Sequence, residues 1–321
     1  MAKIVRTICY FTKKPGEQTL QRLGTLEEML ESEGYEVQTK RICSPDKGFQ
    51  ELKETVNRDS ILLSTGSKKQ LPKEERQDFF EAEDVAFNLN LTDQEIEERH
   101  VDLLFDAMEE SPSSTFSFCY AFNNPGSSPF HPPAQYEEEG FSVGLQATNL
   151  LEGCDSLEEW FEAMEDAWNE IDELFDDEDD FLGIDSSVAP FERDEGSLIE
   201  FITGLGTSFE RSTTQDHYLR TTDFIKSENP NPTGLCGLML PCLEDFPLAE
   251  EYDKGNFPIE RNLFLSLHSG LGVDTYPIGV DENRERVLEI LKTIKTLSNK
   301  HQKPLSARFV SYGEAKIGDD T

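Results

Sequence analysis

The alternation of strand-like and helix-like segments is the feature that most constrains how this chain can fold. Residues 4–11 (IVRTICYF) are apolar and favour a strand, and residues 35–43 (YEVQTKRIC) alternate as a strand should. Between these two segments, apolar side chains recur at helical spacing. A short helix near 49–57 then leads to a third strand near 60–65. This β-α-β-α-β order predicts a parallel sheet with right-handed crossover connections.

The same rhythm returns towards the end of the sequence, so we expect residues 1–321 to form one large α/β domain. Further strands are predicted at 115–122, 181–190, 235–245, 273–279 and 306–313, and further helices near 195–204, 213–227 and 281–301. Residues 70–111 are predicted to be helical, which gives the domain an acidic helical section around 70–180. The loop 123–134 (NNPGSSPFHPPA) is too rich in Pro, Gly and Ser to be regular. A functional lid and a passive surface loop are both compatible with it.

The clearest helix is expected at 155–175. Ser156 and Glu159 fit a capping box at its start. One face carries apolar side chains at three- and four-residue spacing, whereas most of the opposite face is acidic. The apolar stripe comprises Leu157, Trp160, Phe161, Met164, Trp168, Ile171, Leu174 and Phe175. We therefore expect this helix to pack on the core through its aromatic stripe while its acidic face remains in water.

Negative charge is concentrated in the middle of the chain. The net charge is −36, and the 93 residues between Arg99 and Arg193 contain 24 Asp or Glu and no Lys or Arg. Such a surface repels phosphates, which argues against nucleic-acid and anionic-membrane partners. Adaptation to a high internal salt concentration is one explanation, although 16 of the 29 basic residues are Lys. An interaction face for a basic partner or for cations is the other.

The sequence favours a cytoplasmic protein. No stretch of 18 apolar residues is present, and the first residues resemble a strand more than a secretory signal. Six cysteines, at 9, 43, 119, 154, 236 and 242, show no paired spacing. Reduced, mostly buried thiols are the simplest interpretation.

Polar residues at predicted strand ends are the first candidates for a site. Asp185, Glu244 and Asp274 follow or end predicted strands, where α/β sheets usually bind their ligands. If these carboxylates converge, they suit a divalent cation such as Mg²⁺. Spacing alone cannot demonstrate convergence, and the alternative is that they are ordinary solvated acids.

A thiol nucleophile is a second candidate. Cys236 stands between Gly234 and Gly237, and His268 or His217 could serve as its base. An acidic chain tends to raise a thiol pKa, so a structural Cys236 and a core His268 are the plainer alternatives. The pattern Gly270-Leu271-Gly272 is too short for a phosphate-binding loop.

Three segments resemble the family called domain of unknown function 711. They are GIDSSVAP (183–190), TGLCGLMLPCLED (233–245) and SGLGVDTYPIG (269–279), and the opening VRTICYF also resembles the family's first strand. The resemblance implies a barrel-like α/β fold with a parallel-rich sheet flanked by helices, similar to pyruvate formate-lyase and ribonucleotide reductase. It does not imply glycyl radical chemistry, because no RVxGY-like loop occurs. We expect family members to continue for some tens of residues beyond the position of Thr321, so a fragment or a short member is expected.

Two functions remain open from the sequence. The first is a cytosolic enzyme with a pocket at the barrel mouth for a small-molecule ligand. The second is a non-catalytic assembly or binding protein, a homo-oligomer included, that uses the acidic middle third as its interface. If Asp185, Cys236, Glu244, His268 and Asp274 line one pocket, the enzyme is favoured, whereas their dispersal favours the interaction protein.

Overall fold

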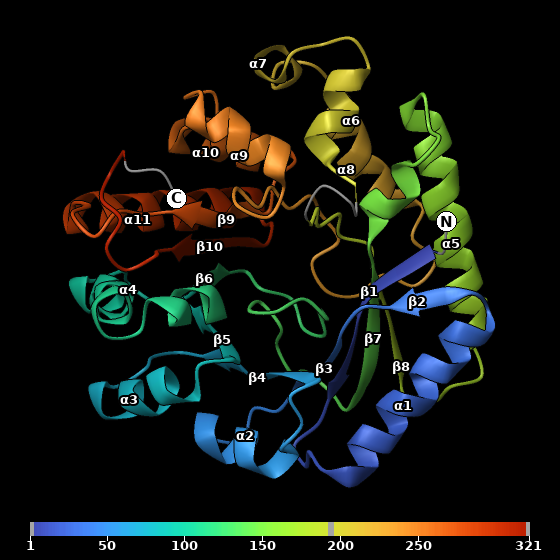
Figure 1. The fold of residues 1–321 in the computed structure, drawn as a ribbon, viewed down its shortest axis with the longest axis horizontal. Helices are drawn as coiled ribbons and strands as arrows, with labels where there is room; N and C mark the ends of the chain where they lie inside the picture. Colours follow the sequence, from blue (N-terminus) through green and yellow to red (C-terminus); the bar gives the residue numbers. More distant parts are fainter. Residues whose placement is uncertain (1–2, 192–195, 319–321) are drawn as a thin grey trace.

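The computed structural model describes residues 3–191 and 196–318 of the chain (Figure 1). The strands are β1 (Lys3–Phe11), β2 (Tyr35–Val37), β3 (Lys40–Cys43), β4 (Ile61–Lys68), β5 (Val85–Asn90), β6 (Phe118–Phe122), β7 (Gly140–Leu145), β8 (Phe181–Asp185), β9 (Gly272–Pro277) and β10 (Leu305–Val310). The α-helices are α1 (Glu17–Ser32), α2 (Phe49–Val56), α3 (Lys73–Ala82), α4 (Glu98–Glu110), α5 (Leu157–Phe175), α6 (Leu198–Gly204), α7 (Phe209–Ser212), α8 (His217–Ser227), α9 (Phe246–Asp253), α10 (Ile259–His268) and α11 (Arg284–His301). Two 3₁₀ helices, η1 (Pro112–Ser117) and η2 (Ala147–Leu151), complete the described elements.

One ten-stranded sheet joins both ends of the described chain, in the order β8-β7-β1-β3-β4-β5-β6-β10-β9, with β2 also pairing with β1. The central strands β1, β3, β4, β5 and β6 are parallel neighbours, which confirms the parallel arrangement predicted for the N-terminal strands. The predicted strand 35–43 is divided into β2 and β3, both parallel to β1. Only the β1–β7 and β6–β10 pairs are antiparallel among these strands. The predicted α/β class, with a mostly parallel sheet flanked by helices, is therefore confirmed.

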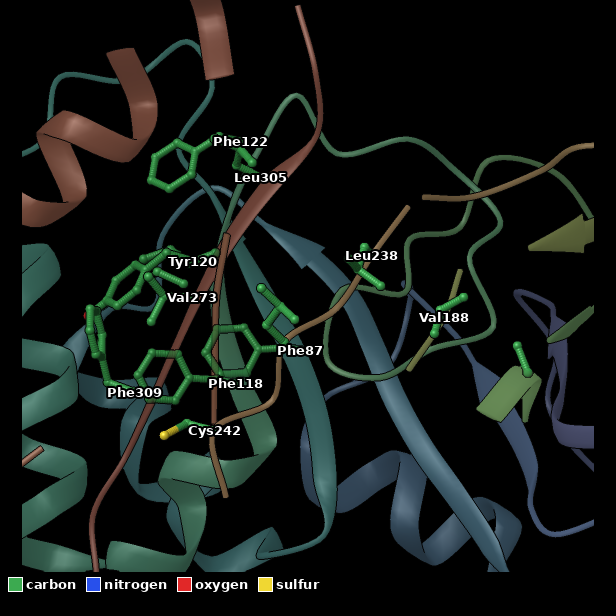
Figure 2. Close-up of a cluster of buried hydrophobic side chains, with 14 of the residues drawn as sticks. Phe87, Phe118, Tyr120, Phe122, Val188, Leu238, Cys242, Val273, Leu305 and Phe309 are labelled. Atoms are coloured by element: carbon green, nitrogen blue, oxygen red, sulfur yellow. The ribbon is translucent and has the colours of Figure 1, made fainter. Parts of the chain in front are cut away.

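The two faces of the sheet carry different side chains. In β5 and β6, the residues Val85, Phe87, Phe118 and Tyr120 belong to the main apolar core, whereas their small neighbour Cys119 faces the opposite way and lines a cavity. Figure 1 shows the helices around the outside, with the strands further in. Figure 2 shows part of the core between sheet and helices, where side chains from β5, β6, β9 and β10 lie together: Phe87, Phe118, Tyr120, Val273 and Phe309. The alternation thus places the large apolar side chains under the helices and small or polar ones on the inner face.

The segment 232–241 connects the two edges of the sheet. It forms isolated bridges with Ile184 and Val188 at the β8 edge and with Gly270 and Asp274 at the β9 edge. The prediction of a strand at 235–245 is therefore wrong, because only isolated β-bridges form in this segment. Two features oppose a regular strand: Pro241 has no N–H to donate, and Cys236 has a positive φ of 43°.

The loop that follows β6 turns back to the inner face of the sheet, and Figure 1 shows it between β6 and β7. Asn88 of β5 donates its side-chain amide to three successive carbonyls of this loop, those of Pro132 (3.3 Å), Pro133 (3.3 Å) and Ala134 (2.9 Å). The small inner-face residues leave room for the loop, and Asn88 satisfies its buried carbonyls. The predicted irregular loop is confirmed, and it is an internal element, not a passive surface loop.

Helix α5 packs as predicted. Ser156 accepts a hydrogen bond from the Glu159 N–H, and Trp160 and Trp168 are completely buried. The Trp160 indole donates to the Ala147 carbonyl at 2.8 Å, whereas Glu158 and Glu162 on the opposite face are exposed. The apolar stripe is therefore covered by the chain's own core.

The middle section is less helical than predicted. Residues 70–111 contain β5 between α3 and α4, and β7 lies in a stretch for which no strand was expected. Both strands are short and almost fully buried, so they lack the alternation of polar and apolar residues that identifies a half-buried strand. None of the helices in the described ranges is long and apolar enough to cross a membrane.

Candidate active site on the inner face of the sheet

A cavity of about 270 Å³ lies on the inner face of the sheet. Strands from both ends of the sequence line it through the following residues: Arg6 (β1), Arg41 (β3), Leu62 (β4), Ala86 (β5), Cys119 (β6), Asp274 (β9) and Arg308 (β10). Glu244, just before α9, Asp84, just before β5, and His131, in the internal loop, add two acids and an imidazole to its lining. The cavity therefore brings together residues that are far apart in sequence.

The cavity lies at the amino ends of the central parallel strands. Arg41, Leu62, Ala86 and Cys119 are each the second residue of their strand. The sequence argument placed the site at the carboxyl ends, where α/β sheets commonly bind ligands. Because β10 runs antiparallel to β6, its later residues reach the amino ends of the other strands. Arg308 thereby joins the cavity.

Arg308 links two of the predicted site residues. Its Nε donates to Asp274 Oδ1 and its Nη2 to Glu244 Oε1, both at 2.7 Å. The guanidinium thus occupies the space between the two carboxylates, where a cation was expected. A positively charged group already balances these acids.

Glu244 has an unusual environment for a carboxylate. Burial raises its pKa above the ordinary 4.5, the positive charge of Arg308 opposes this rise, and the nearby Asp274 carboxylate adds to it. Its side chain nevertheless keeps 26% of its surface accessible. A carboxyl with a raised pKa that still reaches open space is suited to receive and return a proton.

Arg41 is buried without an acidic partner. The residue is 6% exposed, and its Nε donates to Thr39 Oγ1 at 3.2 Å. Among the described residues, no Asp or Glu oxygen lies within ion-pair distance of its guanidinium. Burial, reinforced by the positive charge of Arg6, lowers the pKa of Arg41 to about 9. A guanidinium remains protonated at neutral pH, so the cavity contains a positive charge that an anion would stabilise.

His131 brings a neutral imidazole to the same cavity. Its Nε2 lies 3.8 Å from Cys9 Sγ. Burial, and then the positive charge of Arg41, lower the pKa of His131 well below 6.5. The ring is therefore uncharged at neutral pH and can act as a hydrogen-bond donor or acceptor.

The structure places Asp185 away from this cavity, in a hydrogen-bonded turn. Its carboxylate accepts hydrogen bonds from Ser128 Oγ (2.7 Å) and from the N–H groups of Leu235 (2.9 Å) and Cys236 (3.0 Å). Ser187 donates to it as well, through its hydroxyl at 2.6 Å. Asp185 thus ties the end of β8 to the segment that connects the sheet edges. In the part of the chain that the structure describes, no three His, Cys, Asp or Glu residues are grouped to hold a metal ion.

Cys236 and His268 also lie outside the cavity lining. Burial, followed by the negative charge of Asp185, raises the pKa of Cys236 to about 11, and its thiol donates to the Thr233 carbonyl at 3.1 Å. His268, near the end of α10, pairs with Ser269 Oγ at 2.7 Å. A thiol with a raised pKa is a poor nucleophile at neutral pH. Of the five predicted residues, only Glu244 and Asp274 line the cavity, whereas Asp185 and Cys236 meet in the turn at the end of β8.

Sequence reasoning missed Arg41, Arg308 and His131. A signal was present for the two arginines, because each interrupts a short apolar strand: KRIC in β3 and LSARFV in β10. A charged residue in such a strand must face solvent or a polar interior; Arg41 is buried, and Arg308 keeps only 13% of its side-chain surface exposed. His131 gave no comparable signal, since it lies in a loop whose path depends on tertiary structure.

The fold and the cavity together define a class: a mostly parallel α/β protein with a charged pocket on the inner face of its sheet. The chain belongs to the family described as Uncharacterised ACR (DUF711), whose family model matches residues 100–321. The match includes His131, Glu244, Asp274 and Arg308, whereas Arg41 precedes it. A search of curated proteins found no match. The likeness to pyruvate formate-lyase barrels stays a prediction.

Proposed function

We propose that this protein is an enzyme that binds a small organic monoanion, a carboxylate, in the cavity on the inner face of its sheet. The observation that supports this proposal is Arg41, a buried guanidinium that forms no ion pair with a described Asp or Glu; the charge of Glu244 acts on it without direct pairing. An Arg and a carboxylate form two parallel charge-assisted hydrogen bonds, which are stronger than neutral ones. A bound carboxylate would supply the missing counter-charge.

The size and charge of the cavity favour a small monoanion. Ligand pockets commonly measure about 300–1,000 Å³, so a cavity of about 270 Å³ suits a small metabolite better than a nucleotide. The charge of Arg308 is already offset by Glu244 and Asp274. A ligand with several negative charges, such as phosphate, would be repelled by these two carboxylates. A ligand with a single carboxylate bound to Arg41 would add only the one negative charge that balances this guanidinium.

The proposal is tested by thermal stability in the presence of small anions. Acetate, propanoate, 2-oxobutanoate, 2-hydroxybutanoate, succinate and phosphate would be compared at constant ionic strength. A ligand at about 100 times its Kd adds about 2.7 kcal/mol of stability, which gives a clear rise in melting temperature. We expect a monocarboxylate to produce this rise in the wild type and not in Arg41→Met.

Arg99→Met is the matched control, because Arg99 is an exposed arginine that pairs with Glu97 at 3.0 Å. This variant should respond to carboxylates as the wild type does. If none of the anions stabilises the wild type more than Arg41→Met, the proposed function fails. If phosphate alone does so, the site binds an anion but the carboxylate assignment is wrong.

We further propose a cytoplasmic location, in keeping with six cysteines that are all unpaired thiols. The alternative of an assembly protein has less support, since the aromatic stripe of α5 is buried within the chain. Any interface on the middle third would have to use its acidic face alone. A net charge of −36 argues against a nucleic-acid partner. We propose that this charge reflects adaptation to high salt.

A further inference from the structure

Two side chains in the cavity have an atom available for a ligand. Glu244 uses Oε1 to bind Arg308, and within the described residues its Oε2 has no hydrogen-bond partner. His131 places Nε2 beside Cys9 Sγ, and in the same part of the chain its Nδ1 has none either. Both side chains line the cavity that also contains Arg41. A carboxylate held by Arg41 would therefore lie in a cavity with one carboxylate oxygen and one imidazole nitrogen available.

Both side chains are held firmly. Arg308 fixes Glu244 and is itself fixed by Asp274, at 2.7 Å in each case. The loop that carries His131 is fixed by the three hydrogen bonds from Asn88 to the carbonyls of residues 132–134. Side chains held in this way lose little freedom when a ligand binds, which is a requirement for effective catalysis.

We propose that the cavity catalyses proton transfer at the carbon next to the carbonyl group of a small 2-oxo acid, with Glu244 as the general base and His131 as the donor to the carbonyl oxygen. This inference rests on the proposed function, since Arg41 would hold the carboxylate of the same substrate. Arg308 and Asp274 are positioning residues, because they act through Glu244.

The chemistry balances without an oxidant or a reductant. Glu244 Oε2 takes the proton from the carbon beside the carbonyl, and the electron pair of that C–H bond forms a C=C bond. The carbonyl C=O becomes C–O⁻, which accepts a hydrogen bond from the His131 N–H. Return of a proton from Glu244 to carbon restores the keto acid. In between, the protonated Glu244 exchanges its proton with water, so deuterium enters the substrate in D₂O.

The environments of the two groups support these roles. Burial raises the pKa of Glu244, which makes it a stronger base than an ordinary glutamate. The lowered pKa of His131 keeps its ring neutral, and a neutral imidazole retains one N–H that can donate a hydrogen bond to a developing oxyanion. Opposite pKa shifts in two groups that line one cavity are typical of an acid–base site.

The test is the exchange of deuterium into 2-oxobutanoate and 2-oxopentanoate in D₂O, followed by ¹H NMR, with thermal shift as a separate measure of binding. The wild type should exchange the protons beside the carbonyl faster than buffer does. Glu244→Gln, which keeps an oxygen for Arg308, should bind these acids but exchange them about 10²- to 10⁴-fold more slowly. Arg41→Met should lose both binding and exchange.

Glu260→Gln is the control for Glu244→Gln, since Glu260 is an exposed residue of α10 and should leave exchange unchanged. His131→Gln provides a second test that does not touch the Arg308 ion pairs, and it should slow exchange while binding persists. If the wild type binds the 2-oxo acids but exchanges them no faster than buffer, the acid–base inference is overturned and the proposed function survives. If it binds neither these acids nor any other carboxylate, the proposed function fails and the inference fails with it.

Discussion

Replacement of Arg41 by Met should make the ligand-free protein more stable. The structure lowers the pKa of this guanidinium from 12.5 to about 9, mainly through burial. At 1.36 kcal/mol per pKa unit, the difference corresponds to about 5 kcal/mol by which the fold disfavours the charged form. Met is unbranched and apolar, so it can fill the space without charge. The variant loses the hydrogen bond to Thr39, worth about 1 kcal/mol, and we expect a net gain of about 2–4 kcal/mol.

The sign of this effect does not depend on pH in the ordinary range. A basic group whose pKa is lower in the folded state destabilises the fold at any pH below the folded-state pKa, because the group is then charged in both the folded and the unfolded protein. The gain should therefore stay constant at pH values where Glu244, the nearby acid with a raised pKa, does not change its charge. Urea denaturation followed by tryptophan fluorescence measures it as a shift in the midpoint at constant slope.

Arg308→Met is the matched comparison, because Arg308 is another arginine of the cavity, with 13% of its side-chain surface exposed. It neutralises Glu244 and Asp274, so its removal leaves two partly buried carboxylates without their ion-pair partner. This variant should lose about 3–5 kcal/mol. If Arg41→Met is instead destabilised to a similar extent, Arg41 has a structural partner and the argument for an anion site is refuted.

Three further predictions concern the rest of the molecule. Burial raises the pKa of Asp245 to about 6 from 3.8, so the folded state retains a proton that the unfolded state releases. The free energy of unfolding should therefore fall by up to about 3 kcal/mol as pH rises from about 4 to above 6. Urea titrations of Asp245→Asn across this range should show a smaller fall, and an equal fall would contradict the assignment. The melting temperature should rise between 0.1 M and 1 M NaCl, because salt screens the repulsion within a net charge of −36 as the Debye length falls from about 10 Å to about 3 Å. An unchanged melting temperature would argue against self-repulsion. Tryptophan emission should be blue-shifted in dilute protein and independent of concentration, because Trp160 and Trp168 are fully buried within one chain; a concentration-dependent shift would show that α5 forms an interface.

The local features of the fold were predictable from the sequence. The apolar stripe of α5, the helix near 281–301 and the parallel strands at the N-terminus each depend on a periodicity within a few residues. Such patterns determine which side of an element is buried, because burial of apolar area dominates the free energy of packing. The strands β5 and β7 escaped the same reasoning, since they are buried on both faces and carry little periodicity.

The candidate site depended on the tertiary structure. Arg41 and Arg308 are separated by most of the sequence, and they share a cavity only because the register of each strand fixes which side chains meet on the inner face. The same register leaves Asp185 in a local turn, where five hydrogen bonds from protein groups satisfy it. Sequence determined which residues can carry charge and which segments form strands. Only the tertiary structure decided which charges are paired, because pairing depends on distances of a few ångströms between residues that no local pattern relates.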